Sequence, residues 1–299
     1  MLLLLFSMTA ATVPANSGAE ETGDSARVVR ILFTNNSNGK LTDCNCPSDP
    51  FGGLGERVAL IREYKETYPR FLLLDSGGYL GLTRSKDKSV AVFRLMETMG
   101  YAAYGIGDQE LYYSLGTFLG RYGRWKESIL SATILDCKGG LVFEPYRIFT
   151  ESGVRVAVVG LSSGETFRFF PDDSRDFSVT DPDSVLGDLL PAIESESDYI
   201  VVLSQMGRER DQALAKRWPG IDLIIGGHSQ TLIEKAIVIG DCRIVQAGKG
   251  GGRVGEIVLK FGAGSKPESF SYKLFEVGGR YTIPDDILSE FGNAMKSTN

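Results

Sequence analysis

The sequence is poor in the side chains that most often hold metals or haem. Of its 299 residues, one is histidine and four are cysteine. No C-x₂-C pair occurs, so a structural zinc site is not expected. No C-x-x-C-H motif occurs either, and the single histidine, His228, leaves few axial ligands, so covalently attached haem is not supported.

Clustered positive charge and long hydrophobic runs are missing as well. Lysine and arginine number 32 against 38 acidic residues, and the net charge is −6. A nucleic-acid partner would call for a clustered basic surface, so none is expected. The apolar run Leu2–Phe6 is too short to span a membrane, and no transmembrane segment is expected.

The first 27 residues have the composition of a targeting segment. Small residues around Ala10, Ala15 and Ala19 follow the apolar run, although the basic residues that usually precede such a run are missing. We expect residues 1–27 to form a signal segment and a disordered N-terminus, which would make the protein periplasmic or secreted. The alternative is a disordered N-terminus without a signal.

Apolar periodicity divides the rest of the chain into alternating strands and helices, followed by a β-rich last third. The pattern predicts a mainly parallel, helix-covered sheet and a second sheet packed in the same single domain, residues 28–299. The expected strands are Val28–Thr34, Phe71–Leu74, Tyr101–Ile106, Ser128–Leu135, Val142–Phe149, Val154–Leu161, Tyr199–Leu203, Leu223–Ile225, Lys235–Ile239, Arg243–Ala247, Val254–Phe261 and Phe270–Val277. The expected helices are Glu56–Tyr68, Lys88–Met99, Leu111–Tyr122, Ser184–Glu194, Arg208–Arg217 and Pro284–Met295, with a loop or lid at Phe167–Asp183.

Polar loops follow several of the predicted strands. In a parallel sheet such loops open at one edge, where α/β proteins place their sites. Metal hydrolases build two-ion sites in this way, from carboxylates and imidazoles on several strand ends. The five loops are Asn35–Gly39, Asp75–Gly78, Gly107–Glu110, Ser204–Gly207 and Gly226–Gln230.

These loops resemble, in order, the motifs of the calcineurin-like metallophosphoesterases, and within them the N-terminal domain of periplasmic 5′-nucleotidases. The family pattern runs T-N-D-x-H-G, L-L-D-x-G-D, G-N-H-E, S-H-x-G and G-G-H-S-H. Here the text reads T-N-N-S-N-G, L-L-D-S-G-G, G-D-Q-E, S-Q-M-G and G-G-H-S-Q. The resemblance implies an α/β fold, a four-layer α/β/β/α sandwich of two mixed sheets, without the C-terminal nucleotidase domain.

The departures from the family pattern fall on its metal ligands. Amide side chains are neutral and are weak donors to transition metals, and glycine has no donor at all. The resemblance therefore implies a metallophosphoesterase-like protein that has lost its dinuclear site, acts as a non-catalytic binding or partner protein, and needs no cofactor. The positions of the family's metal ligands hold Asn36, Asn38, Gly78, Asp108, Gln205, His228 and Gln230. The position of the family's catalytic histidine holds Gln109.

The same loops predict a polar crevice. Its amides could satisfy one another as a hydrogen-bonded network, or they could bind a small polar ligand. A partner protein is the other expected ligand class, and the sequence does not identify it. The expected crevice residues are Asn36, Asn38, Asp75, Gly78, Asp108, Gln109, Gln205, His228 and Gln230.

Two alternatives remain open from the sequence. The first is a phosphoester hydrolase of 5′-nucleotidase type with a rebuilt, mononuclear site, in which Asp108 and His228 hold one Mn, Zn or Ca ion. The second concerns Cys44 and Cys46, a C-x-C pair near the first motif. Cys44 could join a disulfide with Cys46 or with a distant cysteine, or the two could form a redox or soft-metal site.

Overall fold

The computed structural model describes residues 27–43, 51–82, 85–169 and 175–296. The expected signal segment and the Cys44 and Cys46 pair therefore lie outside the described residues. Of the other two cysteines, Cys137 is exposed and Cys242 is buried, and neither is in a disulfide. Among the described helices, none has the length and hydrophobicity to cross a bilayer.

The first sheet is mixed. Its first three strands along the chain are parallel to one another, and the last two are added at one side, each antiparallel to its neighbour. The order across the sheet is β13 (Pro267–Glu276), β12 (Arg253–Phe261), β1 (Arg27–Thr34), β2 (Leu72–Asp75) and β3 (Ala103–Tyr104).

The second sheet is also mixed. Its four central strands are parallel, and an antiparallel strand closes each edge. The order is β10 (Ile237–Ile239), β11 (Cys242–Val245), β9 (Leu223–Gly226), β8 (Tyr199–Ser204), β6 (Val154–Leu161) and β5 (Tyr146–Glu151). A small separate ribbon pairs β4 (Ile134–Asp136) with β7 (Phe177–Val179).

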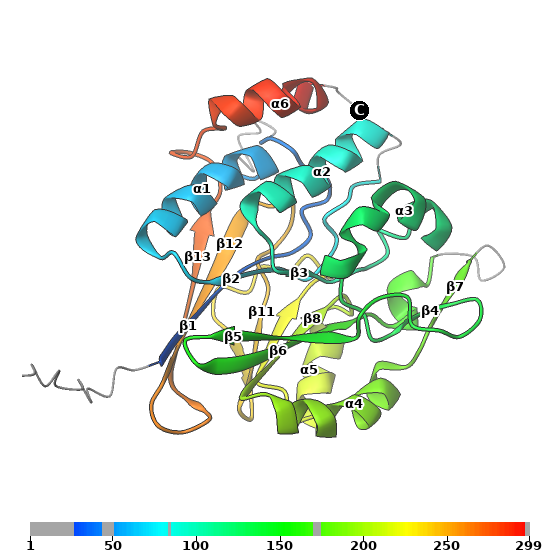
Figure 1. Cartoon of the computed structure of the whole chain (residues 1–299), viewed down its shortest axis with the longest axis vertical. Coiled ribbons are helices and arrows are strands. Elements are labelled where there is room, and N and C mark those ends of the chain that lie inside the picture. Colours follow the sequence, from blue (N-terminus) through cyan, green and yellow to red (C-terminus); the bar gives the residue numbers. More distant parts are fainter. Residues whose placement is uncertain (1–26, 44–50, 83–84, 170–174, 297–299) are drawn as a thin grey trace, which may run out of the picture.

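Helices cover the outer face of each sheet (Figure 1). The first sheet carries α1 (Leu54–Thr67), α2 (Lys86–Met99), α3 (Leu115–Tyr122) and α6 (Asp285–Lys296). The second carries α4 (Pro182–Glu196) and α5 (Arg208–Arg217), and two short 3₁₀ helices, η1 (Gly123–Ser128) and η2 (Gly164–Phe167), lie in the connections.

Three apolar clusters separate the resulting four layers. Successive residues of a strand point to opposite faces, so Ile31 and Phe33 pack between the sheets while Leu32 packs under the helices. In β8, Val201 faces the other sheet and Val202 faces α4 and α5. Both faces are buried, which explains the unbroken apolar runs of the sequence. The predicted four-layer α/β/β/α sandwich of two mixed sheets is confirmed.

Some predicted elements are shorter than expected. The strand predicted at Tyr101–Ile106 is reduced to β3, and the one predicted at Ser128–Leu135 is wrong over most of its length. There η1 ends at Ser128, and Ser131 Oγ accepts hydrogen bonds from the N–H groups of Thr133 and Ile134. Such a local side-chain turn competes with a strand ladder, so β4 begins only afterwards.

The segment predicted as a loop or lid is partly regular. It contains the last residue of η2, the strand β7 and the beginning of α4, which continues through Pro191. Asp176 accepts hydrogen bonds from the N–H groups of Leu115 and Gly116, at 2.7 Å each. This carboxylate therefore ties the segment to the start of α3.

Candidate functional site

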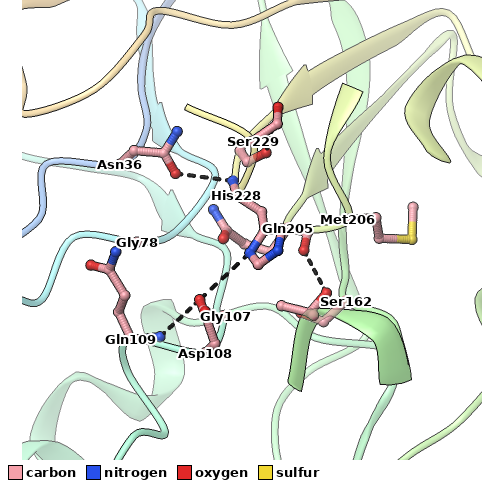
Figure 2. Close-up of polar contacts among 12 residues, drawn as sticks. Asn36, Gly78, Gly107, Asp108, Gln109, Ser162, Gln205, Met206, His228 and Ser229 are labelled. Carbon is pink, nitrogen blue, oxygen red and sulfur yellow. Dashed lines mark hydrogen bonds and ion pairs between the residues drawn. The ribbon is translucent and has the colours of Figure 1, made fainter. Parts of the chain in front are cut away.

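The five strand-end loops meet, but they come from two sheets rather than from one edge. β1, β2 and β3 belong to the first sheet, and β8 and β9 belong to the second. Ser76 Oγ donates to the carbonyl of Gly226 at 3.0 Å, and the N–H of His228 donates to Asn36 Oδ1 at 3.0 Å (Figure 2). The expectation of a single sheet edge was wrong. The two sheets are stacked, and the loops at the carboxyl ends of strands from both sheets meet at the same end of the sandwich.

Left-handed backbone is concentrated in this site. Asn36, Asn38, His228 and Gln230 have φ of 47°, 53°, 60° and 53°, and among the described residues only one other non-glycine residue, Ser152, has a positive φ. Such a backbone costs about 1–2 kcal/mol per residue. Strain of this kind persists where surrounding contacts enforce it, and it clusters at functional sites.

Three amides form a hydrogen-bonded chain where the strand-end loops meet. Gln109 Nε2 donates to Asn38 Oδ1 at 2.8 Å, and Asn38 Nδ2 donates to Gln230 Oε1 at 3.4 Å. Asn36, which is buried, donates instead from Nδ2 to the backbone carbonyl of Gly248 at 3.1 Å. The predicted amide network is therefore present in part, among Gln109, Asn38 and Gln230.

Gln205 does not join that network. Its side chain is 1% exposed, and neither Nε2 nor Oε1 has a hydrogen-bond partner among the described residues. It fills a socket of three glycines: a Cβ added at Gly77, Gly107 or Gly227 would lie 2.8, 2.7 or 2.0 Å from a Gln205 side-chain atom. Gln205 is thus packed by shape into the centre of the site, beside His228 and Gly107 in Figure 2.

Position 78, where the resemblance implies a carboxylate that bridges two metal ions, is crowded by Asn36. Gly78 has φ of 69°, and a Cβ there would lie 3.0 Å from Asn36 Oδ1. A side chain at this position would press on the Asn36 oxygen that accepts the hydrogen bond from the N–H of His228.

Asp108 and His228 are side chains of types that bind metals, and both are partly exposed to solvent. Among the described residues of these loops, they form the one such pair. Asp108 Oδ1 lies 3.7 Å from His228 Nδ1, and the side chains are 28% and 29% exposed. Asp108 Oδ1 also accepts from the N–H of Gln109 at 3.0 Å. Over the described ranges, no three His, Cys, Asp or Glu side chains gather into a metal-binding group.

The residues at this site therefore do not fit the metal pair that the fold family implies. Two divalent ions close together need anionic ligands to offset their repulsion, above all between them. One carboxylate, one imidazole and a set of neutral amides do not supply that charge.

Asp75, expected to line a crevice, is instead completely buried. Its carboxylate is fully buried and accepts from Thr34 Oγ1 and from the N–H of Gly77. Burial raises the pKa of Asp75, while the Thr34 hydrogen bond and the charge of Arg57 oppose the shift. Its role is to fix the turn after β2.

Glu110 holds two of the loops together, a role that the sequence did not reveal. Its buried carboxylate accepts from the N–H groups of Gly78, Leu80 and Gly107, at 3.0–3.1 Å. Burial raises the pKa of Glu110 to about 7, although these three hydrogen bonds lower it. Its place at the end of G-D-Q-E was the available signal.

Asp211 is a second buried carboxylate that the sequence reading passed over. It lies on α5, where its Oδ1 accepts from Ser204 Oγ and its Oδ2 has no partner among the described side chains. Burial raises the pKa of Asp211 to about 7, opposed by the Ser204 hydrogen bond and by His228. The signal was its spacing: Asp211, Leu214 and Ala215 lie on one helix face, and all three are buried.

No family model matches the chain. Curated proteins do match it, and the chain spans about half of their length or less. The 5′-nucleotidase of Vibrio cholerae serotype O1 is 28% identical over 89% of this chain and 54% of that protein. The mouse 5′-nucleotidase is 28% identical over 78% of this chain and 42% of that protein.

Solved structures share the fold. The 5′-nucleotidase precursor from Thermus thermophilus superposes with a TM-score of 0.78 at 23% identity, over 90% of this chain and 58% of that one. The calcineurin-like phosphoesterase YfkN from Bacillus subtilis gives 0.76 at 20% identity, over 90% of this chain and 97% of that one. The chain is therefore a distant homologue of the N-terminal part of 5′-nucleotidases, and it has the fold of the calcineurin-like phosphoesterases.

Proposed function

We propose that this chain is a non-hydrolytic member of the family, a binding or partner protein built on the phosphoesterase fold. Hydrolysis in a two-metal site depends on ions that activate water and clamp the phosphoryl oxygens. The amide, glycine and single-imidazole set described above supports the loss of that chemistry.

The observation that carries this proposal is the packing of Gln205. A residue that remained from a metal site by chance would leave a void or point into solvent. Here the side chain occupies the space beside Gly77, Gly107 and Gly227, where an added Cβ would come within 2.8, 2.7 and 2.0 Å of it. Close packing of this kind stabilises the site as it stands, without an ion to organise it.

Turnover assays on the purified protein test the proposal. We expect no hydrolysis of p-nitrophenyl phosphate, bis-p-nitrophenyl phosphate or a nucleoside monophosphate above background, with Mn²⁺, Zn²⁺ or Ca²⁺ added. Metal analysis of the same sample should find less than one ion per chain. Metal-dependent turnover that disappears in the His228→Ala variant would refute the proposal.

One observation favours a second candidate, a hydrolase with a single weak metal ion. Asp108 and His228 lie close together and are partly exposed, as a two-ligand remnant would be. Calorimetric titration with Mn²⁺ or Zn²⁺ separates the two candidates. Stoichiometric binding that is lost in both Asp108→Asn and His228→Ala would favour the hydrolase.

We also propose export to the periplasm or the medium, on the basis of the apolar run Leu2–Phe6 and the small residues that follow it. Expression of the full sequence followed by fractionation and N-terminal sequencing tests this. An uncleaved cytoplasmic product would contradict it. The same sample, treated with a thiol reagent before and after reduction, would show whether Cys44 and Cys46 are oxidised.

A further inference from the structure

An open cavity lies at one edge of the first sheet, outside the strand-end loops. Its volume is about 760 Å³, which is in the range of small-molecule sites. Its lining residues come from the start of β12 and the end of β13, from the link between β13 and α6, and from the segments before α1 and after β9. None of them belongs to the five loops that meet at the end of the sandwich.

Hydrogen bonds between backbone groups hold the walls of this cavity in place. Val277, which is fully buried, donates to the carbonyl of Gly252 and accepts from the N–H of Gly52, both at 2.9 Å. These two bonds join the start of β12, the end of β13 and the segment before α1. The segment after β9 is fixed by Tyr272, whose hydroxyl donates to the carbonyl of Ile233 at 2.6 Å. The cavity is therefore preformed, which lowers the cost of binding a ligand.

An ion pair that is open to solvent lies in the wall. Arg253 Nη2 and Glu276 Oε1 are 3.4 Å apart, and the two side chains are 27% and 55% exposed. The Arg253 guanidinium also lies over the ring of Phe51, 5.7 Å from its centroid, and this contact orients it. Among the described residues, Arg253 Nε and Nη1 have no hydrogen-bond partner, and neither has Glu276 Oε2. Both charged groups can therefore bind a further partner.

The spacing of this ion pair matches the two charges of a free α-amino acid. The ammonium nitrogen and the carboxylate oxygens of an amino acid are roughly 3 Å apart, as backbone bond lengths require. A carboxylate on Arg253 and an ammonium group on Glu276 can therefore be bound side by side. Glu234 and Arg280 add one charge of each sign to the lining, so the cavity favours neither a lone cation nor a lone anion.

Two partly exposed leucines, Leu232 and Leu274, give the cavity an apolar surface. The aromatic rings of the lining, those of Phe51, Phe275 and Tyr281, each already have a cationic side chain over them. An aliphatic group, which gains by burial alone, therefore suits this surface better than a group that has to stack on a ring.

We propose that this cavity binds a free α-amino acid with an aliphatic side chain of about the size of leucine. The carboxylate accepts from the unpaired N–H groups of Arg253, and the ammonium group donates to Glu276. The side chain lies against Leu232 and Leu274. This proposal goes beyond the proposed function, because it gives the protein a ligand at a second place that does not depend on the chemistry of the strand-end loops.

Ligand-observed NMR titration of the purified full-length protein tests this with leucine and three comparison compounds. 4-Methylpentanoate lacks the ammonium group of leucine, 3-methylbutylamine lacks its carboxylate, and glycine lacks its side chain. Leucine should bind, and each comparison compound should bind at least about tenfold more weakly, the equivalent of 1.4 kcal/mol.

Two variants assign the charged groups. Arg253→Gln should weaken leucine binding about tenfold and remove the advantage of leucine over 3-methylbutylamine, because the carboxylate has lost its charged donor. Glu276→Gln should do the same for the advantage of leucine over 4-methylpentanoate. Arg62→Gln is the matched control, since it breaks another exposed ion pair, with Asp286 of α6, outside the cavity, and should leave binding unchanged. Thermal melts show that each variant is folded.

The proposal is overturned if leucine does not bind, if any comparison compound binds as tightly as leucine, or if either cavity variant binds leucine like the wild type. It is also overturned if a cavity variant weakens all four compounds equally, since that result indicates a structural role alone. Turnover is measured in separate assays, so failure here leaves the proposal of a non-hydrolytic protein standing, and turnover there would refute that proposal by itself.

Discussion

The backbone N–H of His228 donates to Oδ1 of Asn36 at 3.0 Å, and this bond joins the loop after β9 of one sheet to the loop after β1 of the other. The same amide donates from Nδ2 to the carbonyl of Gly248 at 3.1 Å. One side chain therefore links three segments that are distant in sequence. The link suits its position, because Asn is among the few residues that tolerate left-handed backbone.

Replacing this amide should destabilise the protein measurably. Asn36→Gly keeps the left-handed φ without strain and removes both hydrogen bonds, so we expect a loss of about 2 kcal/mol in the free energy of unfolding. Urea denaturation measures it. Asn38→Gly is the matched control, since that residue is also left-handed but less buried, and it should change stability by less than about 1 kcal/mol. Equal effects of the two variants would contradict the linking role of Asn36.

Glu110 should be essential to the shape of the site. In the wild type, three backbone N–H groups donate to the carboxylate oxygens of Glu110. In Glu110→Gln, one of these oxygens is replaced by an NH₂ group, which is a donor and cannot accept from them. Leaving such buried donors unpaired costs about 1–3 kcal/mol. We expect a stability loss in that range by urea denaturation, and little change for Asp108→Asn, whose side chain is partly exposed. A Glu110→Gln variant with the same stability as the wild type would show that these contacts do not hold the loops together.

Stability should fall as the pH rises from about 4 to above 7. The pKa of Glu110 and of Asp211 is about 7 in the folded chain, above the ordinary values of 4.5 and 3.8. The native state therefore binds more protons than the unfolded state in this window, and each group favours folding most below its unfolded pKa. At about 1.36 kcal/mol per pKa unit, each contributes a change of roughly 3–4 kcal/mol.

Asp211→Asn tests the sign of this dependence. The substitution removes a buried charge while an oxygen remains to accept from Ser204 Oγ. We expect the variant to be more stable than the wild type at pH 8 and to lose part of the slope between pH 4 and 8, measured by urea denaturation across that range. A slope that is unchanged, or stability that rises with pH in both proteins, would contradict the assignment.

The sequence could place the site but not all of its chemistry. Strand-end loops such as Asp75–Gly78 and Gly226–Gln230 were readable, because an apolar run that stops at glycines marks where a buried strand delivers its loop. Gly78, at the position where the resemblance implies a metal-bridging carboxylate, was readable as well. Both features could be read from the order of the motifs along the chain.

Other features depended on distances that a linear pattern does not contain. The convergence of loops from two sheets requires knowing which strands pair, and β12 pairs with β1 across more than two hundred residues. Nothing in S-Q-M-G indicates that Gln205 lies against glycines of three other loops. For the same reason the amide network was predicted to include Gln205, and the structure leaves that side chain outside it.

The fit of Gln205 against Gly227 predicts that the effects of substitutions at these two positions on stability are coupled. Such coupling is measured with two single variants and the double variant. A Cβ at Gly227 would lie 2.0 Å from Gln205 Nε2, so Gly227→Ala should be destabilised by about 1–3 kcal/mol through overpacking. Gln205→Ala should also be destabilised, because it leaves a cavity in the glycine socket.

The double variant should be more stable than the sum of the two losses implies, with a coupling of about 0.5–3 kcal/mol, because the new methyl group occupies space that the shortened side chain has vacated. A double-mutant cycle in urea measures this coupling. Gly100→Ala combined with Gln205→Ala is the matched pair, since a Cβ at Gly100 meets nothing within 4 Å and its own cost, set by a left-handed φ of 81°, should simply add. If Gly227 and Gln205 are additive as well, the side chain does not fill the centre of the site, and the main support for a non-hydrolytic crevice is lost.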